Sequence, residues 1–310
     1  MEYEKTPRNK INRLGKRGVY DYETVHRIID SSPILHVAFN PVDDPDGFPV
    51  VLPMLGCTAA YSEDNTQADS ASTVPAANAP TDSESPPDPT PAAPPGAFPS
   101  EDDDNTEDPA DAPDIDVDND DPSGPRSIYL HGWVSARLLR APDSGTRVCI
   151  SAAHVDGAVL ALAPFHNSAN YRSAVVFGLA APVASPRERA FALRRITDNF
   201  ARGRWARSRG PPTTAELRST GVLRVDVESA SAKVRVGGPS DDRADLADER
   251  VRGETWTGVV PMYTVYGEPI AAPLNGVEGV PAYIERWREE SNREAERYAV
   301  WAATAGESKK

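Results

Sequence analysis

The segment 62–125 is the part of this sequence that most constrains the fold. It contains 18 acidic residues and 13 prolines, has no lysine or arginine, and carries few aliphatic side chains suited to a core. A segment of this composition buries too little apolar surface to offset the entropy lost on ordering. We therefore predict a disordered, acidic, proline-rich loop inserted between two adjacent strands. The cost of closing a loop grows slowly with length, so such an insertion is compatible with a compact domain.

The rest of the chain divides around this insertion. Residues 1–61 and 126–275 are predicted to form one domain together, and residues 276–310 a C-terminal helix and tail. The whole chain has a formal net charge of −14, but 33 basic and 29 acidic residues remain outside the insertion. The acidity therefore belongs to the insertion and says little about the partners of the folded domain.

Composition also limits the expected compartment and partners. The basic first 18 residues have little aromatic interleaving and no nucleic-acid-binding module follows them, so we expect no nucleic-acid partner. The longest apolar run, 174–184, is interrupted by a glycine and a proline and is too short to span a membrane. The N-terminus lacks the apolar stretch of a secretory signal, and the two cysteines fit a reducing compartment. We expect a cytoplasmic protein with no membrane span and no metal site.

Hydrophobic periodicity favours a mostly β structure. Six or seven segments alternate apolar and polar residues, and helical segments interrupt them without alternating regularly with them. This arrangement favours an antiparallel barrel with added helices, of the α+β class, over a doubly wound parallel sheet. The sequence contains no GxGxxG, GxxxxGK[ST] or GxSxG motif, so Rossmann, P-loop and serine-hydrolase assignments have no support.

Cap residues mark the predicted helices. Asp21 is placed to cap a helix over Asp21–Ser31. Ser185, followed by a proline and then Glu188, has the pattern of a capping box at the start of another helix. The last predicted helix covers Val280–Ala303.

Two strand assignments rest on turn signals. The Asp156-Gly157 pair predicts a hairpin between the strands Thr146–His154 and Ala158–Ala163. A further strand is predicted over Thr255–Ile270.

The stretch Ser127–Arg140 combines a strand with a candidate anion site. Alternating residues predict a strand at its start, and the apolar spacing after Gly132 predicts the first turns of a helix. Ser135 lies where that helix would begin, with Arg137 two residues later. A helix start with a hydroxyl and a guanidinium suits a phosphate group. The alternative is that Ser135 only caps a surface helix and Arg137 is solvated.

This stretch resembles the flavin-phosphate segment of the pyridoxamine 5'-phosphate oxidase-like, FMN-binding split-barrel proteins. The resemblance lies in Tyr129–His131 followed by a Ser-x-Arg turn. It is greatest toward the branch of nitroimidazole-resistance and flavin-nucleotide-binding proteins. Other stretches resemble that branch in the same order: Arg17–Asp21 leading to Ile28–Asp30, His166–Ser173, and Trp256–Pro261.

The resemblance implies an antiparallel split barrel that binds FMN, with haem as the alternative cofactor. It implies a catalytic role for His131 beside the cofactor, and the alternative is a histidine whose hydrogen bonds are made by the backbone at the barrel rim. For Tyr171 and Arg172 the alternative is stacking at a dimer interface, and for Trp256 it is packing. The implied cofactor-binding residues are Ser135, Arg137, Tyr129, Tyr171, Arg172, Ser173 and Trp256.

The function implied by this resemblance is an FMN-dependent oxidoreductase that acts as a homodimer on an unidentified small molecule. The alternative is a flavin- or haem-binding split-barrel protein without turnover. A third hypothesis is an interaction protein that works through the acidic insertion 62–125.

Overall fold

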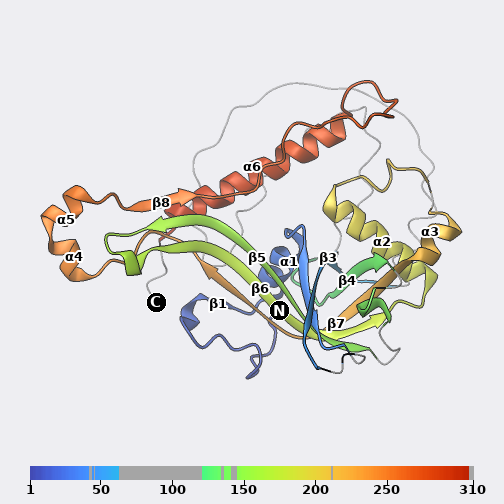
Figure 1. Cartoon of the computed structure of the whole chain (residues 1–310), viewed down its shortest axis with the longest axis horizontal. Coiled ribbons are helices and arrows are strands. Elements are labelled where there is room, and N and C mark those ends of the chain that lie inside the picture. Colours follow the sequence, from blue (N-terminus) through green and yellow to red (C-terminus); the bar gives the residue numbers. More distant parts are fainter. Residues whose placement is uncertain are drawn as a thin grey trace.

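The computed structural model describes residues 1–306 apart from 42, 43, 45, 63–120, 134, 135, 141–144 and 211. Its centre is a closed antiparallel barrel with helices on its outside and at one end (Figure 1). The neighbouring strands run in the order β7-β4-β3-β2-β5-β6, and β6 pairs with β7 to close the barrel. The α+β barrel expected from the sequence is confirmed. The barrel strands are β2 (Leu35–Phe39), β3 (Val50–Ala59), β4 (Ser127–Trp133), β5 (Thr146–Leu160), β6 (Ser168–Pro182) and β7 (Thr220–Arg235).

Alternation along the strands builds the core. In β2, Leu35 and Val37 are fully buried inside the barrel, whereas His36 between them is exposed. One end of the barrel is filled by α1 (Tyr22–Asp30), whose Ile28 and Ile29 are fully buried. The predicted cap is confirmed, because the side chain of Asp21 accepts a hydrogen bond from the Thr24 backbone N–H at 2.7 Å.

The predicted insertion leaves and re-enters the barrel at one point. Ala59, the last residue of β3, pairs with Ser127, the first residue of β4. The long connection therefore joins two adjacent strands, as predicted. Most of it, residues 63–120, lies outside the described residues.

Helices cover the outside of the barrel. The second helix, α2 (Pro186–Phe200), packs Ala192 and Ile196 on the outer side chains of β3 and β4. The Ser185 side chain caps it by accepting from the Glu188 N–H at 3.4 Å. The Glu188 carboxylate does not close the predicted capping box, because it accepts from the Tyr129 hydroxyl and from Arg224. The other helices are α3 (Thr214–Ser219), α4 (Arg243–Ala247), α5 (Glu249–Glu254) and α6 (Ala282–Thr304), with 3-10 turns η1 (Gly15–Arg17), η3 (Leu138–Arg140) and η4 (Pro164–His166).

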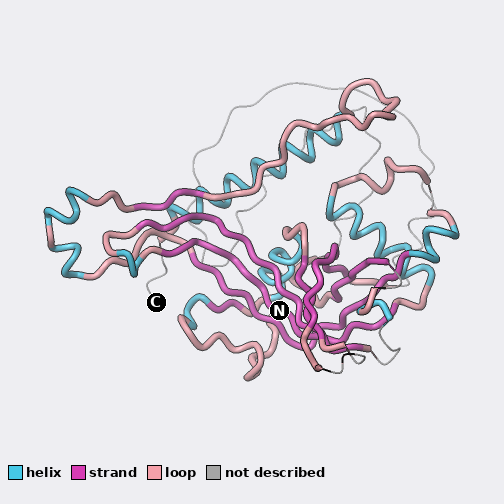
Figure 2. Tube along the Cα trace, viewed as in Figure 1, coloured by secondary structure: helices cyan, strands magenta, loops and turns pink. Residues whose placement is uncertain are grey.

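Beyond the barrel, β5 and β6 continue as a long arm that is joined by the far part of β7 (Figure 2). The final helix, α6, lies along this arm, where Tyr298 and Ala302 pack on Val234 and Val236. The short β1 (Gly18–Val19) pairs with β7. None of the helices within the described residues is both long and apolar enough to cross a membrane.

Three expectations need correction. The hairpin predicted at Asp156-Gly157 is absent, because β5 runs unbroken through it with a register shift between Val155 and Gly157. The strand predicted over Thr255–Ile270 is only β8 (Gly258–Pro261). The helix predicted after Gly132 is represented, among the described residues, by the 3-10 turn η3. A turn this short offers little dipole to an anion.

Candidate functional site

Two cavities lie at opposite ends of the pairing between β2 and β5. The pairing runs from His36 opposite Ser151 to Phe39 opposite Val148. Residues at its Phe39 end line the first cavity, and residues at its His36 end line the second. With a rise of about 3.3 Å per residue, the pairing between them is only about 10 Å long.

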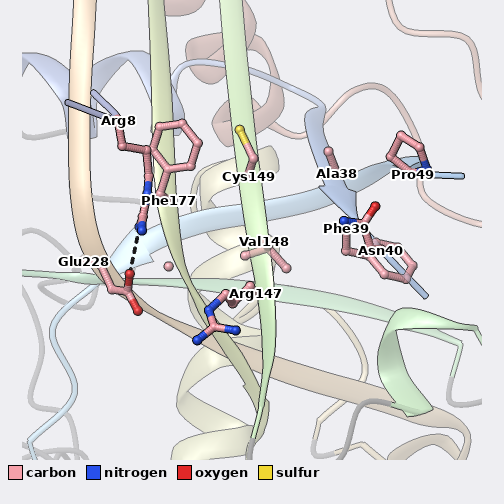
Figure 3. Close-up of a pocket in the computed structure, with 11 residues that line it drawn as sticks. Arg8, Ala38, Phe39, Asn40, Pro49, Arg147, Val148, Cys149, Phe177 and Glu228 are labelled. Atoms are coloured by element: carbon pink, nitrogen blue, oxygen red, sulfur yellow. Dashed lines mark hydrogen bonds and ion pairs between the residues drawn. The ribbon is translucent and has the colours of Figure 1, made fainter. Parts of the chain in front are cut away.

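The first cavity, here the arginine cavity, has a volume of about 400 Å³. Arg8 closes one side through an ion pair with Glu228 at 2.9 Å, and its guanidinium lies over the ring of Phe177 (Figure 3). Arg147 is exposed at the start of β5 and has no ion-pair or hydrogen-bond partner among the described residues. The remaining lining residues are Ala38, Phe39, Asn40, Pro49, Val148, Cys149 and Gly178. The cavity therefore combines apolar walls with an uncompensated cation.

The second cavity, here the aromatic cavity, has a volume of about 970 Å³. It opens where β5 lacks a neighbour on one side, since β2 pairs with β5 up to Ser151 and β8 pairs with it only from Gly157. The end of α1, the end of α2, the segment after β8 and one side of α6 surround this gap. Its aromatic lining consists of Phe200, Tyr263, Tyr266, Trp287 and Tyr298.

Two histidines line the aromatic cavity. His36 is exposed, and its imidazole makes no hydrogen bond within the described part of the chain. His154 is held in place, because its Nε2 lies 3.2 Å from the Ser31 hydroxyl and 3.4 Å from the Ile28 carbonyl oxygen. Burial, together with the nearby Arg172, lowers the pKa of His154 to about 4, so its imidazole is neutral at neutral pH. A neutral imidazole can act as a metal ligand or as a hydrogen-bonding group.

A buried ion pair forms part of the wall of the aromatic cavity. Arg172 Nε donates to Asp156 Oδ1 at 3.2 Å, and the guanidinium lies 3.9 Å from the ring centre of Tyr298. Asp156 is only 4% exposed, and its other oxygen, Oδ2, has no hydrogen-bond partner among the described residues. Burial raises the pKa of this carboxyl, although the Arg172 charge opposes the rise.

Asp30 brings a second, partly buried carboxylate to the same cavity. Its oxygens accept from the backbone N–H and the hydroxyl of Thr58, both at 2.6 Å, and Arg126 Nη1 lies 3.5 Å away. Burial raises its pKa to about 6, against these stabilising contacts. Thr58 and Arg126 flank the insertion, so this cluster ties its two ends to α1.

One of the two predicted phosphate residues, Arg137, lies near the β2–β3 turn. Ser135 is outside the described residues. Arg137 is exposed and lies 3.8 Å from the carboxylate of Asp44, which belongs to that turn. Asn40 and Pro49 of the arginine cavity flank the same turn. Arg137 and the arginine cavity therefore border one segment.

The other predicted residues are spread over the barrel. His131 is partly buried opposite Leu55, and burial lowers its pKa. Tyr129 is 1% exposed beneath α2 and donates its hydroxyl to Glu188 at 2.8 Å. Of the three neighbours on β6, only Arg172 lines the aromatic cavity.

Ser173 and Tyr171 are both partly buried, and the Ser173 hydroxyl donates to the Lys233 carbonyl oxygen at 3.4 Å. Trp256 is 65% exposed beside Gly258 and lines neither cavity. The structure thus brings Arg172 to a cavity and leaves Tyr129, Ser173 and Trp256 away from both.

Four residues of the cavities were not singled out from the sequence: His36, Arg147, His154 and Asp156. For His36 the available signal was a histidine at a polar position of an alternating strand. The Asp156-Gly157 pair led to the prediction of a hairpin turn, whereas in the structure it lies at the bulge in β5.

Comparison with known proteins agrees with the barrel. Residues 117–234 match the family model described as pyridoxamine 5'-phosphate oxidase. This segment includes Tyr129–His131 and His166–Ser173, two of the stretches that carried the resemblance. The resemblance to the pyridoxamine 5'-phosphate oxidase-like split-barrel family seen in the sequence is confirmed over this part of the chain.

Two solved structures share the fold over nearly their whole length. The flavocytochrome Anf3 from Azotobacter vinelandii is 24% identical, with a TM-score of 0.61, and the match covers 91% of this chain and 97% of that one. The FAD and heme binding protein from Mycobacterium smegmatis is 22% identical, with a TM-score of 0.58 and coverage of 88% and 97%. No curated protein matches the chain at a significant level.

Proposed function

We propose that this protein binds a flavin nucleotide, and that the flavin lies across the β2–β5 pairing with its phosphate at the arginine cavity. The proposal rests on one observation, the placement of the two cavities one after the other along the β2–β5 pairing. A cation and an apolar strip lie at one end of the pairing, and a larger aromatic cavity lies about 10 Å farther along the strands. A flavin nucleotide has the same succession of an anionic phosphate and a planar aromatic ring.

The residues present fit such a ligand. Arg147 is exposed and has no carboxylate partner among the described residues, and Arg137 lies 3.8 Å from Asp44 of the β2–β3 turn. Guanidinium groups bind phosphate oxygens well because of their planar set of N–H donors. The cavity walls between are mostly apolar and include the Cys149 thiol, whose pKa burial raises, so the thiol is uncharged at neutral pH. The one carboxylate in the lining, that of Glu228, is paired with Arg8 at 2.9 Å.

Within this proposal, Arg147 and Arg137 hold the phosphate, with Ser135 as a further donor. His131 and Arg172 lie beside the ring system. A bound flavin would supply hydride or single-electron transfer, and the protein would supply binding, orientation and hydrogen bonds to the ring edge. We further propose an oxidoreductase that acts on a small molecule admitted through the aromatic cavity.

We also propose that two copies associate through exposed apolar side chains at the start of β3 and the end of β4. Val51 of β3 and Trp133 of β4 are 56% and 64% exposed, and Phe48, in the segment before β3, is 71% exposed. Several large apolar side chains gathered on one face are typical of an interface. The homodimer expected from the sequence is consistent with this face.

A second candidate function is haem binding in the aromatic cavity. The observation that favours it is His36, a histidine at the cavity without a hydrogen-bond partner among the described residues, beside the neutral His154. Both solved structures compared above are described as containing haem together with a flavin or as a flavocytochrome. In this arrangement His36 would supply the iron ligand and the aromatic side chains would cover the porphyrin.

The first experiment is a visible absorption spectrum of the purified protein, followed by titration of FMN, FAD and haem. Flavin bands are the expected result, and chromatography of the released cofactor identifies FMN or FAD. Arg147→Ala should weaken flavin binding about tenfold, because the loss of one hydrogen bond to a charged group costs about 1.5 kcal/mol. Arg187→Ala, which removes an exposed arginine of α2 outside both cavities, is the matched control. A wild-type protein that takes up neither flavin would overturn the proposal.

The haem candidate has its own readout. A Soret band in the wild-type protein that shifts or is lost in His36→Ala but persists in His166→Ala would support it. His166 is on the hairpin between β5 and β6 and lines neither cavity. An unchanged Soret band in His36→Ala would exclude His36 as the ligand.

A further inference from the structure

His166 lies outside both cavities, at the far end of the arm. It is the last residue of η4, the 3-10 turn that connects β5 to β6, and it lies beside the start of α4 (Figure 1). Its side chain is 27% exposed, whereas its Nδ1 atom is buried and has no hydrogen-bond partner among the described residues. The exposed part of the imidazole is therefore on the Nε2 side of the ring, where a ligand can reach it.

Three carboxylates from one short segment surround this imidazole. Asp242 Oδ2 lies 3.8 Å from Nε2, and Asp241 Oδ1 lies 3.9 Å from Nδ1. An oxygen of Asp245 lies within 4.8 Å of the His166 nitrogen and of the Asp242 oxygen. None of these carboxylates pairs with a lysine or arginine in the part of the chain that the structure describes. Three carboxylates outweigh a single imidazole even when it is protonated, so the charge of this cluster favours a cation as its ligand.

Asp242 departs from the usual behaviour of its position. It is the N-cap residue of α4, yet its side chain makes no cap hydrogen bond. An aspartate at this position normally accepts from a backbone N–H of the first helical turn. Here one carboxylate oxygen lies toward Nε2 of His166 instead, too far away for a hydrogen bond. The oxygens of Asp242 therefore remain available to a ligand.

The spacing of the ligand atoms fits one metal ion. Two ligands at 2.0–2.2 Å from the same ion lie about 3–4 Å from each other, depending on the angle between them. The separations in this cluster, from 3.8 Å to at most 4.8 Å, need only small side-chain rotations to reach that range. One imidazole nitrogen with two carboxylate oxygens suits zinc and related divalent transition metals, whereas Mg²⁺ and Ca²⁺ prefer oxygen ligands alone.

Asp241 supplies the support that a metal-binding histidine requires. Its side chain is only 4% exposed, and its Oδ1 accepts from the Leu162 backbone N–H at 2.8 Å, which ties it to the β5–β6 connection. Metal-binding histidines usually donate their other ring N–H to a carboxylate or a carbonyl group. Since Nδ1 of His166 faces Asp241, a shift of about 1 Å would form this hydrogen bond. The buried Nδ1 atom thereby gains its missing partner.

We propose that His166, Asp242 and Asp245 bind a divalent transition metal ion, which links the tip of the β5–β6 arm to the start of α4. Asp241 is a positioning residue that orients the imidazole through Nδ1. The three ligands line neither cavity, so the inference does not depend on flavin or haem binding. It differs from the expectation of no metal site, because these ligands are far apart in the sequence and meet only in the fold.

The test is calorimetric titration of zinc chloride into the full-length protein, after treatment with a chelator and removal of the chelator. We expect one zinc ion per chain at the tightest site. Asp241→Asn keeps an oxygen for the Leu162 N–H but removes the charge, and it should weaken zinc binding by about 10–100-fold. His166→Ala and Asp245→Asn remove ligands and should each weaken binding at least as much. Glu249→Gln, which removes an exposed carboxylate of α5 outside the cluster, is the matched control and should bind zinc as the wild-type protein does.

Hydrogen exchange followed by mass spectrometry then locates the bound ion. Zinc should slow exchange in the β5–β6 connection and in α4 and leave the barrel strands unchanged, and a circular dichroism melt verifies that each variant is folded. No zinc binding, wild-type affinity in His166→Ala, or zinc uptake with unchanged exchange at both segments would overturn the inference. Tighter binding of Ca²⁺ or Mg²⁺ than of Zn²⁺ would also overturn it, because the imidazole would then not be a ligand.

Discussion

Asp30 gives a prediction whose size can be worked from the structure. Its carboxylate is largely buried at the end of α1, and burial raises its pKa from 3.8 to about 6 despite two hydrogen bonds from Thr58 and the nearby Arg126. Because the folded-state pKa lies above the unfolded one, the fold favours the protonated carboxyl. The contribution of Asp30 to stability is therefore fully present below about pH 4 and is lost as the pH rises through about 6.

The perturbation is Asp30→Asn, which removes the titration and keeps the shape. With these two pKa values, the free energy of unfolding of the wild-type protein should fall by about 2 kcal/mol relative to the variant between pH 4 and pH 7. Other titrating groups are present in both proteins and cancel in the difference. The absolute stability of the variant is a separate quantity, since it leaves Arg126 without its carboxylate partner.

The assay is urea unfolding of both proteins at half-unit pH steps, followed by far-ultraviolet circular dichroism. The control is Glu23→Gln, which removes an exposed carboxylate from the same helix. The difference in free energy of unfolding between this variant and the wild-type protein should change little with pH. A difference that is constant with pH, or that changes in favour of the wild-type protein as the pH rises, would refute the reasoning about burial at Asp30.

Two further predictions concern the packing of the barrel. Tyr129→Phe removes the hydroxyl that donates to the buried Glu188 and should lower the free energy of unfolding by about 1–3 kcal/mol, measured by urea unfolding, because the carboxylate loses a buried donor; an unchanged midpoint would show that Arg224 alone satisfies this carboxylate. Gly56→Ala should destabilise by about 1–3 kcal/mol, since a Cβ there would lie 2.6 Å from the Tyr129 carbonyl oxygen and from the Leu130 side chain. Gly210→Ala, with nothing within 4 Å of the added carbon, is the control for the thermal melt, and equal melting temperatures would contradict the steric argument.

Local sequence patterns predicted most of the strands and helices, because contacts between residues close in sequence determine where these elements form. The alternation of buried Leu35, Val37 and Phe39 with exposed His36 is the kind of pattern that predicted the barrel strands, and Asp21 predicted a helix start. The β5 bulge was missed for the opposite reason. Its Asp-Gly pair has the chemistry of a turn, and only pairing with β6 on one side and β8 on the other keeps the strand continuous there.

The site was harder to predict, because its groups meet only in three dimensions. Asp156 and Arg172 are 16 residues apart, and Tyr298 comes from the last helix of the chain. No spacing rule joins such positions. Family resemblance pointed to Arg172, which lines the aromatic cavity, but gave no reason to select Arg147, which lines the arginine cavity and has no carboxylate partner among the described residues.

The pairing of Ala59 with Ser127 has a practical consequence for protein engineering. Paired residues on neighbouring antiparallel strands have Cα atoms about 5 Å apart, so the connection between them begins and ends at nearly the same place. Replacing residues 63–120 with a short turn, or cutting the chain there to create new termini, should preserve the strand register and the clamp of Asp30, Thr58 and Arg126. The same position can accept a reporter domain, which makes it a natural attachment point for following ligand binding by energy transfer.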